Sequence, residues 1–391
     1  DYDLNVLDAK TPAYGQQTSI RYAEKTLAFH WTYEHLSKES RRYLFFLPRE
    51  LRWTVEGWRV LITHTNPTPP PEILTRYTPK KHLRKLAKSC EVDLVIYGHS
   101  HRAFKRHVKD VWFLSPGSVG RPDDGDPRTS YMLLKLEPGS LKVHHYRLDY
   151  DVPTVIAAIR QHALPDAFAQ MFTQGQSLDT VLQMADVKRA IALLKEEPTM
   201  ASVLDLAERC EYDPLFAYHV AQLALKLFDE LHPLHNLGSE SRRRLHYAAW
   251  LHNIGWVGGK KKHHKRALHL ILEDPYLRLD GRERLIIGTI ARYHRKALPK
   301  QKHAHFAALS RKTQERVVWL AGILRVASGL NYTHRGLVET LTCEIRTGQV
   351  ILHCGTRETA DAERNAALKK AHLLETVSGR RLDIKMHLIL S

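Results

Sequence analysis

The hydrophobic pattern of this chain changes character near Ser177, and that change limits the folds that it can adopt. Before Ser177, short apolar runs typical of strands alternate with helical patterns and turn residues. After it, amphipathic helical stretches follow one another to about residue 330. An alternating stretch from Leu337 and a final strand then indicate a small mixed tail. The sequence therefore predicts an α/β sheet domain followed by an all-α domain with an α+β tail.

These changes of pattern predict four segments. We expect the sheet domain over residues 1–176, a linker helix over 177–197, the helical domain over 198–335 and the tail over 336–391. Thr78-Pro79 is a good helix start, so a helix is expected from there to about Cys90. The tail should hold a hairpin around Thr347-Gly348, one helix near 360–376 and a last strand over 381–390. Strands of the sheet domain are expected at 58–63, 93–97, 111–115, 130–135 and 141–148.

The charge balance of the chain is strongly basic. Over 391 residues the formal net charge is +17, which favours phosphate-bearing partners such as nucleic acid, nucleotides, polyphosphate or an anionic membrane surface. A solvated basic surface without a specific ligand is the alternative. No apolar run approaches the roughly 20 residues that cross a bilayer. The four cysteines are scattered without a CxxC pair, which suits a reducing cytoplasm.

Three histidines follow two of the predicted strands. His64 comes directly after the strand at 58–63, and His99 and His101 come after the strand at 93–97, in "YGHSH". Because the strand ends of an α/β sheet meet at one edge, we expect these imidazoles to converge there. Neutral imidazoles are natural ligands of Mn, Fe, Zn or Ni. The alternative for this spacing is a pair of loop histidines without a ligand.

These segments resemble the last motifs of calcineurin-like metallophosphoesterases, specifically the small bacterial phosphodiesterase group. The resemblance rests on "VLITHTNP", "YGHSH" and "SPGSVGRPDDGDPRTSYMLL", and it covers about residues 1–175. It implies that His64 and His99 bind one ion of a divalent metal pair and that His101 binds the other. Such a pair polarises a phosphate ester for in-line attack.

The resemblance also implies further ligands upstream: an Asp-x-His, a bridging Asp and an Asn-His pair that ligates and protonates. None of these precedes His64 in usable form. The Asn-His pair of that family is commonly followed by an acid, so Asp1 is expected to be the residue after it. We therefore expect the chain as given to lack the opening strands of the domain and to be inactive, and a longer product with the missing ligands to be active.

Histidines also recur in order in the helical half. They lie in "DPLFAYHV", "AAWLHNIGW", "KKHHKRAL" and "IARYHRKALPK", at His219, His252, His264 and His294. With the later "LAGILRVASGLNYTHR", these stretches resemble the C-terminal HD-type domain of the exopolyphosphatase and guanosine pentaphosphate phosphatase (Ppx/GppA) family over about residues 198–391.

An active HD site, by this resemblance, needs a His, a His-Asp pair and a distal Asp around a divalent metal. Here Asn253 replaces the acid of the pair, and Ser328 stands where the distal acid is expected. Losing both carboxylates removes about two negative charges from the shell of a hard cation. We therefore expect a degenerate HD site, in which the remaining histidines could hold only a softer metal at reduced affinity.

Basic residues are concentrated in the same region of the sequence. Lysines give sequence-independent contacts to phosphates, and arginines add planar, bidentate ones. Because the resembling family handles polyphosphate and guanosine phosphates, we expect a polyanion-binding groove, with a merely solvated face as the alternative. The residues expected to form it are Lys260, Lys261, Lys262, Lys265, Arg266, Arg292, Arg295 and Lys296.

Three functions follow from these features. The first is a two-metal phosphoesterase that acts on phosphodiesters or phosphomonoesters and whose degenerate helical domain binds polyphosphate or nucleotide polyanions. The second is a non-catalytic regulatory protein that binds polyphosphate or an alarmone. The third is an exopolyphosphatase-like hydrolase acting through the helical domain. Expected partners are a phosphorylated small molecule or polyphosphate, nucleic acid on charge alone, and a second copy of the chain in a homodimer.

Overall fold

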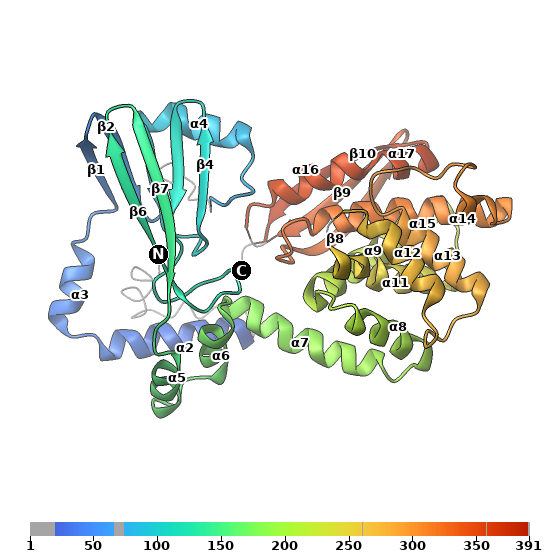
Figure 1. The fold of residues 1–391 in the computed structure, drawn as a ribbon, viewed down its shortest axis with the longest axis horizontal. Coiled ribbons are helices and arrows are strands. Elements are labelled where there is room, and N and C mark those ends of the chain that lie inside the picture. The colour runs from blue at the N-terminus through green and yellow to red at the C-terminus, as the bar shows by residue number, and fades with distance from the viewer. Residues whose placement is uncertain (1–19, 66–73, 260, 357, 390–391) are drawn as a thin grey trace. The chain divides into compact units, whose positions relative to one another are not determined.

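The structure is a computed structural model that describes residues 20–65, 74–259, 261–356 and 358–389. It divides into two compact units between Gln183 and Met184, inside helix α7 (Leu178–Leu194). Each unit has an apolar core of its own. The elements are labelled in Figure 1. Within the described ranges, none of the helices has the length and apolar character that crossing a bilayer requires.

A five-stranded sheet forms the centre of the first unit, in the order β1-β2-β3-β5-β4. Its three inner strands run parallel, and β1 and β4 pair antiparallel at the two edges. The strands predicted at 58–63, 93–97 and 111–115 are confirmed as β2, β3 and β5. The sequence pattern misses β1, because that strand is exposed at every position and shows no burial alternation. The strand bounds are β1 Glu50–Val55, β2 Trp58–Thr63, β3 Leu94–Tyr97, β4 Phe104–Val108 and β5 Val111–Ser115.

The two faces of this sheet are covered by different elements. On one face, α4 (Lys80–Cys90) buries Leu83, Leu86 and Cys90, whose spacing of three and four residues puts them on one side of the helix. On the other face lies the antiparallel pair β6 (Thr129–Glu137) and β7 (Ser140–Leu148), whose apolar side chains pack on the sheet. The sheet is therefore enclosed on both faces, and the ends of its parallel strands are left to form a site.

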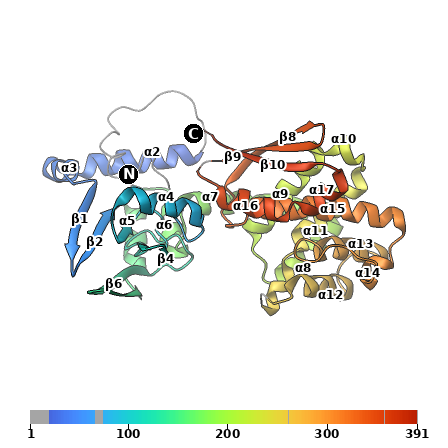
Figure 2. The same ribbon diagram turned by 90° about the horizontal axis from the view of Figure 1, so that it is seen from above.

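Helices complete the first unit. In Figures 1 and 2, α5 (Val152–Gln161) and α6 (Asp166–Gln174) lie side by side. Two more, α2 (Ile20–His35) and α3 (Lys38–Phe45), precede the sheet. The helix predicted to start at Thr78-Pro79 begins at Lys80, because Pro79 takes the N-cap position and makes no side-chain cap. The hydroxyl of Thr78 instead accepts a hydrogen bond from the backbone of Thr75 at 2.8 Å.

The second unit is mostly helical and encloses one large apolar core. The central helix is α15 (Arg311–Leu330), which is buried at every position from Leu320 onward. Two glycines of this helix, Gly322 and Gly329, let other backbones approach it closely. A Cβ at Gly329 would lie 2.4 Å from the Cα of Ala367. The other helices are α8 Pro198–Arg209, α9 Pro214–Glu230, α10 His232–His235, α11 Ser239–Leu251, η1 Ile254–Gly258, α12 His263–Glu273, α13 Gly281–Arg292 and α14 Ala304–Ala307.

A three-stranded sheet and two helices end the second unit. The predicted hairpin is confirmed as β8 (Val338–Arg346) and β9 (Gln349–Thr356), and β10 (Arg381–Leu388) adds parallel to β9. The single helix expected near 360–376 is wrong: the structure has α16 (Asp361–Lys370) and α17 (His372–Ser378). Beyond the break, Leu374 packs on Gly322 of α15, where the missing side chain leaves room for it.

Candidate functional site

The sheet edge of the first unit brings two of the predicted histidines together. Strands β2 and β3 pair in parallel with Thr63 opposite Tyr97. The backbone pairing continues past their ends, because His99 N–H donates to the carbonyl of His64 at 2.9 Å. The two rings therefore lie close together in a T-shaped arrangement, with Nδ1 of His99 3.4 Å from Nε2 of His64 and ring centroids 5.3 Å apart.

This separation suits two ligands of one metal ion. Imidazole nitrogens bound at about 2.1 Å to one tetrahedral ion lie about 3.4 Å from each other. His64 is exposed and His99 is half-buried, so both rings are accessible from solvent. The absence of a side chain at Gly98 makes room for the His64 ring, because a Cβ there would come 3.0 Å from Nδ1 of His64. His64 and His99 fit a divalent metal, and bound there it would supply a positive charge beside a phosphate oxygen.

His101 lies in a different environment. Its backbone is left-handed, with φ of 51°, and its Nδ1–H donates to the carbonyl of Arg121 at 2.9 Å. This bond leaves the lone pair on Nε2, which is how metal-bound histidines are usually oriented. Burial lowers the pKa of His101, so its imidazole is neutral at pH 7. Among the described residues, however, no group of three His, Cys, Asp or Glu side chains is placed to hold one ion.

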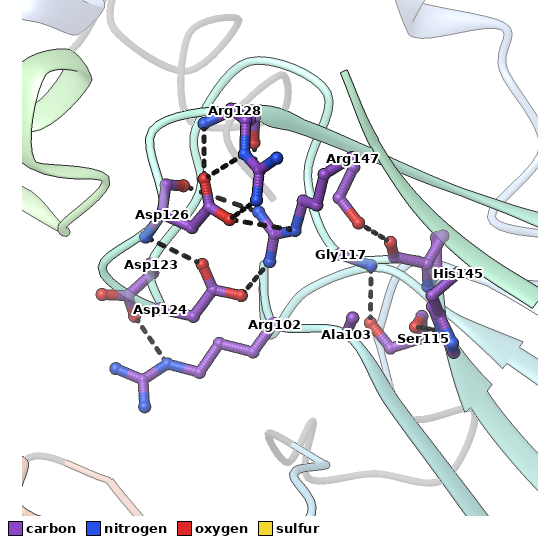
Figure 3. A network of polar contacts seen from close by, with 12 residues as sticks. Arg102, Ala103, Ser115, Gly117, Asp123, Asp124, Asp126, Arg128, His145 and Arg147 are labelled. Carbon is purple, nitrogen blue, oxygen red and sulfur yellow. Dashed lines mark hydrogen bonds and ion pairs between the residues drawn. The ribbon is translucent and has the colours of Figure 1, made fainter. Parts of the chain in front are cut away.

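The acidic loop after β5 is occupied by its own arginines (Figure 3). Arg128 pairs with Asp126 at 2.7 Å, Arg147 pairs with Asp124, and Arg102 lies 3.4 Å from Asp123. The Arg128 hydrogen bond is the main reason that the pKa of Asp126 falls to about 2. These carboxylates therefore pair with arginines of their own unit, and Asp123 also acts on His101 by raising its pKa.

The second unit gathers four histidines at helix ends. His252 follows α11, His294 follows α13, and His263 and His264 begin α12. All four are buried. The ring centroid of His294 lies 4.9 Å from that of His252 and 5.4 Å from that of His263. Three of them are predicted from the sequence and His263 is not, although the "HH" pair in "KKHHKR" offers it as readily as His264.

Two of these histidines are fixed in the same way. The Nδ1–H of His252 donates to Ala249 O at 2.7 Å, and that of His294 donates to Ala291 O at 2.8 Å. Both rings therefore carry their lone pair on Nε2. Burial lowers the pKa of His252 to about 3, and it lowers that of His294 well below its usual range. Both imidazoles are neutral at pH 7.

An ammonium group lies beside the position where the distal acid is expected. Lys370, the last residue of α16, donates from Nζ to Oγ of Ser328 at 3.0 Å. Burial, with the charges of Arg295 and Arg325, lowers its pKa to about 8. The same ammonium contributes to the low pKa values of His252 and His294. A divalent metal does not fit this donor set, because its charge would add to that of Lys370 without a carboxylate to offset it.

Two further residues of the predicted HD site are Asn253 and His219. Asn253 is the N-cap of η1 and makes no side-chain cap. His219, on α9, packs against Gly336, where a Cβ would come 2.5 Å from its Nε2. The buried Asn331 accepts a hydrogen bond from Gly336 N at 3.0 Å. Asn331 thus supports the loop that His219 contacts.

The predicted polyanion-binding residues differ in exposure. Lys261, Lys262, Lys265 and Lys296 are exposed, and Arg295 is half-buried, with Nη1 3.4 Å from Nε2 of His263. Arg266 is used within the fold, since it donates to the carbonyl of Gly259 at 3.1 Å. Arg292 is buried. Lys260 lies outside the described residues.

Family models match both units. Residues 31–139 match the calcineurin-like phosphoesterase superfamily domain, and residues 199–375 match domain III of the Ppx/GppA phosphatases. The two matched families are those that the sequence motifs of each unit resemble. The degenerate HD character of the second segment stays a prediction.

Two curated archaeal proteins resemble the chain in part. An uncharacterised protein of Methanocaldococcus jannaschii is 25% identical over 175 residues, which cover 40% of this chain and 70% of that protein. A probable metallophosphoesterase of Methanothermobacter thermautotrophicus is 31% identical over 97 residues, which cover 25% of this chain and 51% of that protein. The chain thus spans about half the length of the second relative. The bacterial subgroup expected from the motifs stays a prediction.

Solved structures give similar partial matches. The metallophosphoesterase of Sphaerobacter thermophilus matches with a TM-score of 0.34 and 22% identity, covering 44% of this chain and 74% of that one. A hypothetical protein of Pyrococcus horikoshii matches with a TM-score of 0.38 and 19% identity, covering 44% of this chain and 70% of that one.

Proposed function

Since the chain carries a calcineurin-like phosphoesterase segment and a Ppx/GppA phosphatase domain III, we propose that it is a metal-dependent phosphoesterase whose helical unit binds polyphosphate or another phosphate-rich anion. The phosphoesterase part of this proposal rests on one observation: ring nitrogens of His64 and His99 lie 3.4 Å apart at the ends of two parallel strands. Divalent metals at this edge would supply the positive charge that polarises a phosphate ester and activates water.

The residues of the edge have distinct parts in this proposal. His64 and His99 hold one ion, and Gly98 keeps the space between the strand ends open for the His64 ring. His101 offers its Nε2 toward a second ion, because the Arg121 carbonyl occupies its Nδ1–H. The further ligands of a complete two-metal site are not assigned to particular residues of the described ranges.

The phosphoesterase proposal is tested on the full-length natural protein. We expect hydrolysis of bis-p-nitrophenyl phosphate with Mn²⁺ and loss of that activity in His99→Ala. The matched control is His144→Ala, an exposed histidine of β7 in the same unit. Mn²⁺ content after dialysis should fall in His99→Ala and stay unchanged in the control. Equal activity and metal content in the two variants would refute the assignment.

The helical unit binds its anion through the exposed lysines at the start of α12. Three of them, Lys261, Lys262 and Lys265, lie within five residues of one another and are exposed. We expect polyphosphate affinity to fall steeply with salt, because each bound phosphate releases counterions. The triple change of these lysines to Ala should weaken binding. A control triple of exposed lysines elsewhere in the unit is Lys312, Lys369 and Lys385. The surface assignment fails if both triples have the same affinity.

A second candidate function is a non-catalytic protein that binds polyphosphate or an alarmone. It is favoured by the cationic surroundings of the histidine cluster and by the absence, among the described residues, of a three-ligand metal group. Anion binding by the full-length protein with no turnover under any divalent metal would select it. The exopolyphosphatase-like reading of the helical unit is disfavoured by Lys370, which lies where that chemistry needs an acid.

A further inference from the structure

The three-stranded sheet of β8, β9 and β10 carries two histidines on its outer face. Strands β9 and β10 lie side by side and pair in parallel (Figure 1), with His387 opposite Gly355. Leu352 and Cys354 are fully buried, and His353 lies between them in β9. Because side chains alternate between the two faces of a sheet, His353 and Gly355 share the face away from the core. His387, as the partner of Gly355, lies on that face as well.

The ring nitrogens of this pair are separated as two ligands of one metal ion would be. Nδ1 of His353 lies 3.1 Å from Nε2 of His387, and the ring centroids are 5.4 Å apart with planes inclined by 14°. Nitrogens bound at about 2.1 Å to one ion lie about 3.0 Å apart at a right angle and about 3.4 Å apart at a tetrahedral angle. The observed separation falls between these two values.

Glu344 of β8 fixes the orientation of His353. Its Oε2 lies 3.3 Å from Nε2 of His353, the ring nitrogen that does not face His387. Hydrogen bonds from Arg346 and then from His353 lower the pKa of Glu344, so its carboxylate is ionised at pH 7 and only accepts. In the neutral ring, Nε2 of His353 therefore carries the hydrogen and Nδ1 carries a lone pair toward His387. Metal-bound histidines usually have a carboxylate or carbonyl in this position.

A hydrogen bond between the two rings is the alternative for this contact, with Nε2–H of His387 donating to Nδ1 of His353. Metal binding needs the other tautomer of His387, in which the hydrogen is on Nδ1 and Nε2 has the lone pair. That change moves a hydrogen within one ring and takes no proton from the molecule. Since His387 is exposed, water accepts from its Nδ1–H in that tautomer.

The charges around this pair differ from those of the buried histidine cluster. Lys385 lies opposite His353 in β10, but it is exposed, so water and salt screen its charge. Glu344 adds a negative charge beside His353. The buried cluster has instead the enclosed ammonium of Lys370. The outer face of the sheet therefore opposes a cation much less than that cluster does.

We propose that His353 and His387 bind a divalent transition-metal ion such as Zn²⁺ and that Glu344 is a positioning residue for His353. Imidazole nitrogens select such ions over Mg²⁺ and Ca²⁺, which prefer oxygen ligands. Within the described ranges no third His, Cys, Asp or Glu is placed to join the pair, so water fills the other positions of the ion. The ion ties the last strand to the middle strand of the sheet. The inference does not depend on the proposed function, because it uses none of the residues of the sheet edge.

Zn²⁺ binding by the full-length protein tests the pair by calorimetry, in the background of His99→Ala. That change removes the ion proposed for the sheet edge from the count. We expect the number of bound Zn²⁺ ions to fall by one per chain in His353→Asn and in His387→Asn. The matched control, His372→Asn, changes an exposed histidine of α17 in the same unit and should keep the full number. A full number in either of the first two variants, or no Zn²⁺ bound in the background itself, overturns the proposal.

The part of Glu344 is tested by its effect on the Zn²⁺ affinity in the same background. Glu344→Ala should weaken binding by about tenfold or more, as the loss of the partner behind a metal-bound histidine usually does. Glu344→Gln keeps an oxygen that accepts from Nε2–H of His353 and should restore most of the affinity. An unchanged Zn²⁺ affinity in Glu344→Ala, or an equal loss in the two variants, overturns the positioning role.

Discussion

The two units place histidines at similar spacing in opposite surroundings. At the sheet edge, His64 and His99 have ring centroids 5.3 Å apart and are open to solvent. In the helical unit, His252 and His294 have ring centroids 4.9 Å apart and are fully buried. The first pair follows strand ends and the second follows helix ends. We therefore expect the surroundings of each pair, and not the spacing of its imidazoles, to decide whether it binds a metal.

The charges near each pair make the difference. At the sheet edge, charges of both signs act on His101, because Arg121 lowers its pKa and Asp123 raises it. The helical cluster has Lys370 inside it and arginines beside it. We therefore expect the neutral imidazoles of the sheet edge to accept a divalent ion and the ammonium of Lys370 to repel one from the helical cluster.

The largest expected effect is on metal binding after the acids are restored in the helical unit. In the double variant Asn253→Asp with Ser328→Asp, Lys370 should pair with the new acid at 328, because its Nζ already lies 3.0 Å from Oγ there. Adding Lys370→Met should then raise Co²⁺ affinity by about a thousandfold, because the new acid at 328 no longer has to leave an ion pair, and two unit charges about 4 Å apart attract each other by about 4 kcal/mol at an effective dielectric of 20. Visible absorption of Co²⁺ measures it.

The control in that background is Lys369→Met, an exposed lysine one residue away. It should leave the Co²⁺ affinity unchanged. If both methionine variants bind Co²⁺ equally, the ammonium of Lys370 is not what keeps metal from this cluster.

The second effect is a loss of stability in mild acid. The pKa of His264 is lowered by burial, and then by Arg292, from 6.5 to about 4. Below pH 6.5 the unfolded chain takes up a proton at this residue that the folded chain excludes, so stability is full above pH 6.5 and falls toward pH 4. One such histidine costs about 3 kcal/mol between pH 7 and pH 4. In urea unfolding, the free energy of unfolding of His264→Asn should fall between pH 7 and pH 4 by about 3 kcal/mol less than that of the wild type. An equal fall in the two proteins would contradict the prediction.

A third effect, of about 100-fold, is expected on phosphoesterase activity at the sheet edge. Gly98→Ala puts a Cβ 3.0 Å from Nδ1 of His64 and should displace that ring, and a misplacement of about 1 Å can cost a hundredfold in rate. The matched change is Gly120→Ala, where a Cβ meets nothing within 4 Å. Bis-p-nitrophenyl phosphate turnover with Mn²⁺ should separate the two. Similar rates would mean that His64 does not act at this edge.

The sequence predicts the sheet edge better than the helical cluster, for a physical reason. Strands at 58–63 and 93–97 are short apolar runs, and parallel strands bring the residues after them to one edge. The adjacency of His64 and His99 follows from that rule. The contact of Lys370 with Ser328 joins residues 42 positions apart through the packing of α16 on α15, and no local pattern encodes it.

The smallest effect is on the free energy of unfolding when the hydrogen bond between Lys370 and Ser328 is removed. Ser328→Ala removes the acceptor of the Lys370 ammonium and should lower the free energy of unfolding by about 1.5 kcal/mol, the usual contribution of a hydrogen bond to a charged group. In the background of Lys370→Met the same change should cost much less, because the donor is gone. Urea unfolding of the wild type, both single variants and the double variant gives the coupling between the two residues. A coupling of zero would mean that Ser328 does not hold the ammonium, and the contrast between the clusters would then rest on the arginines alone.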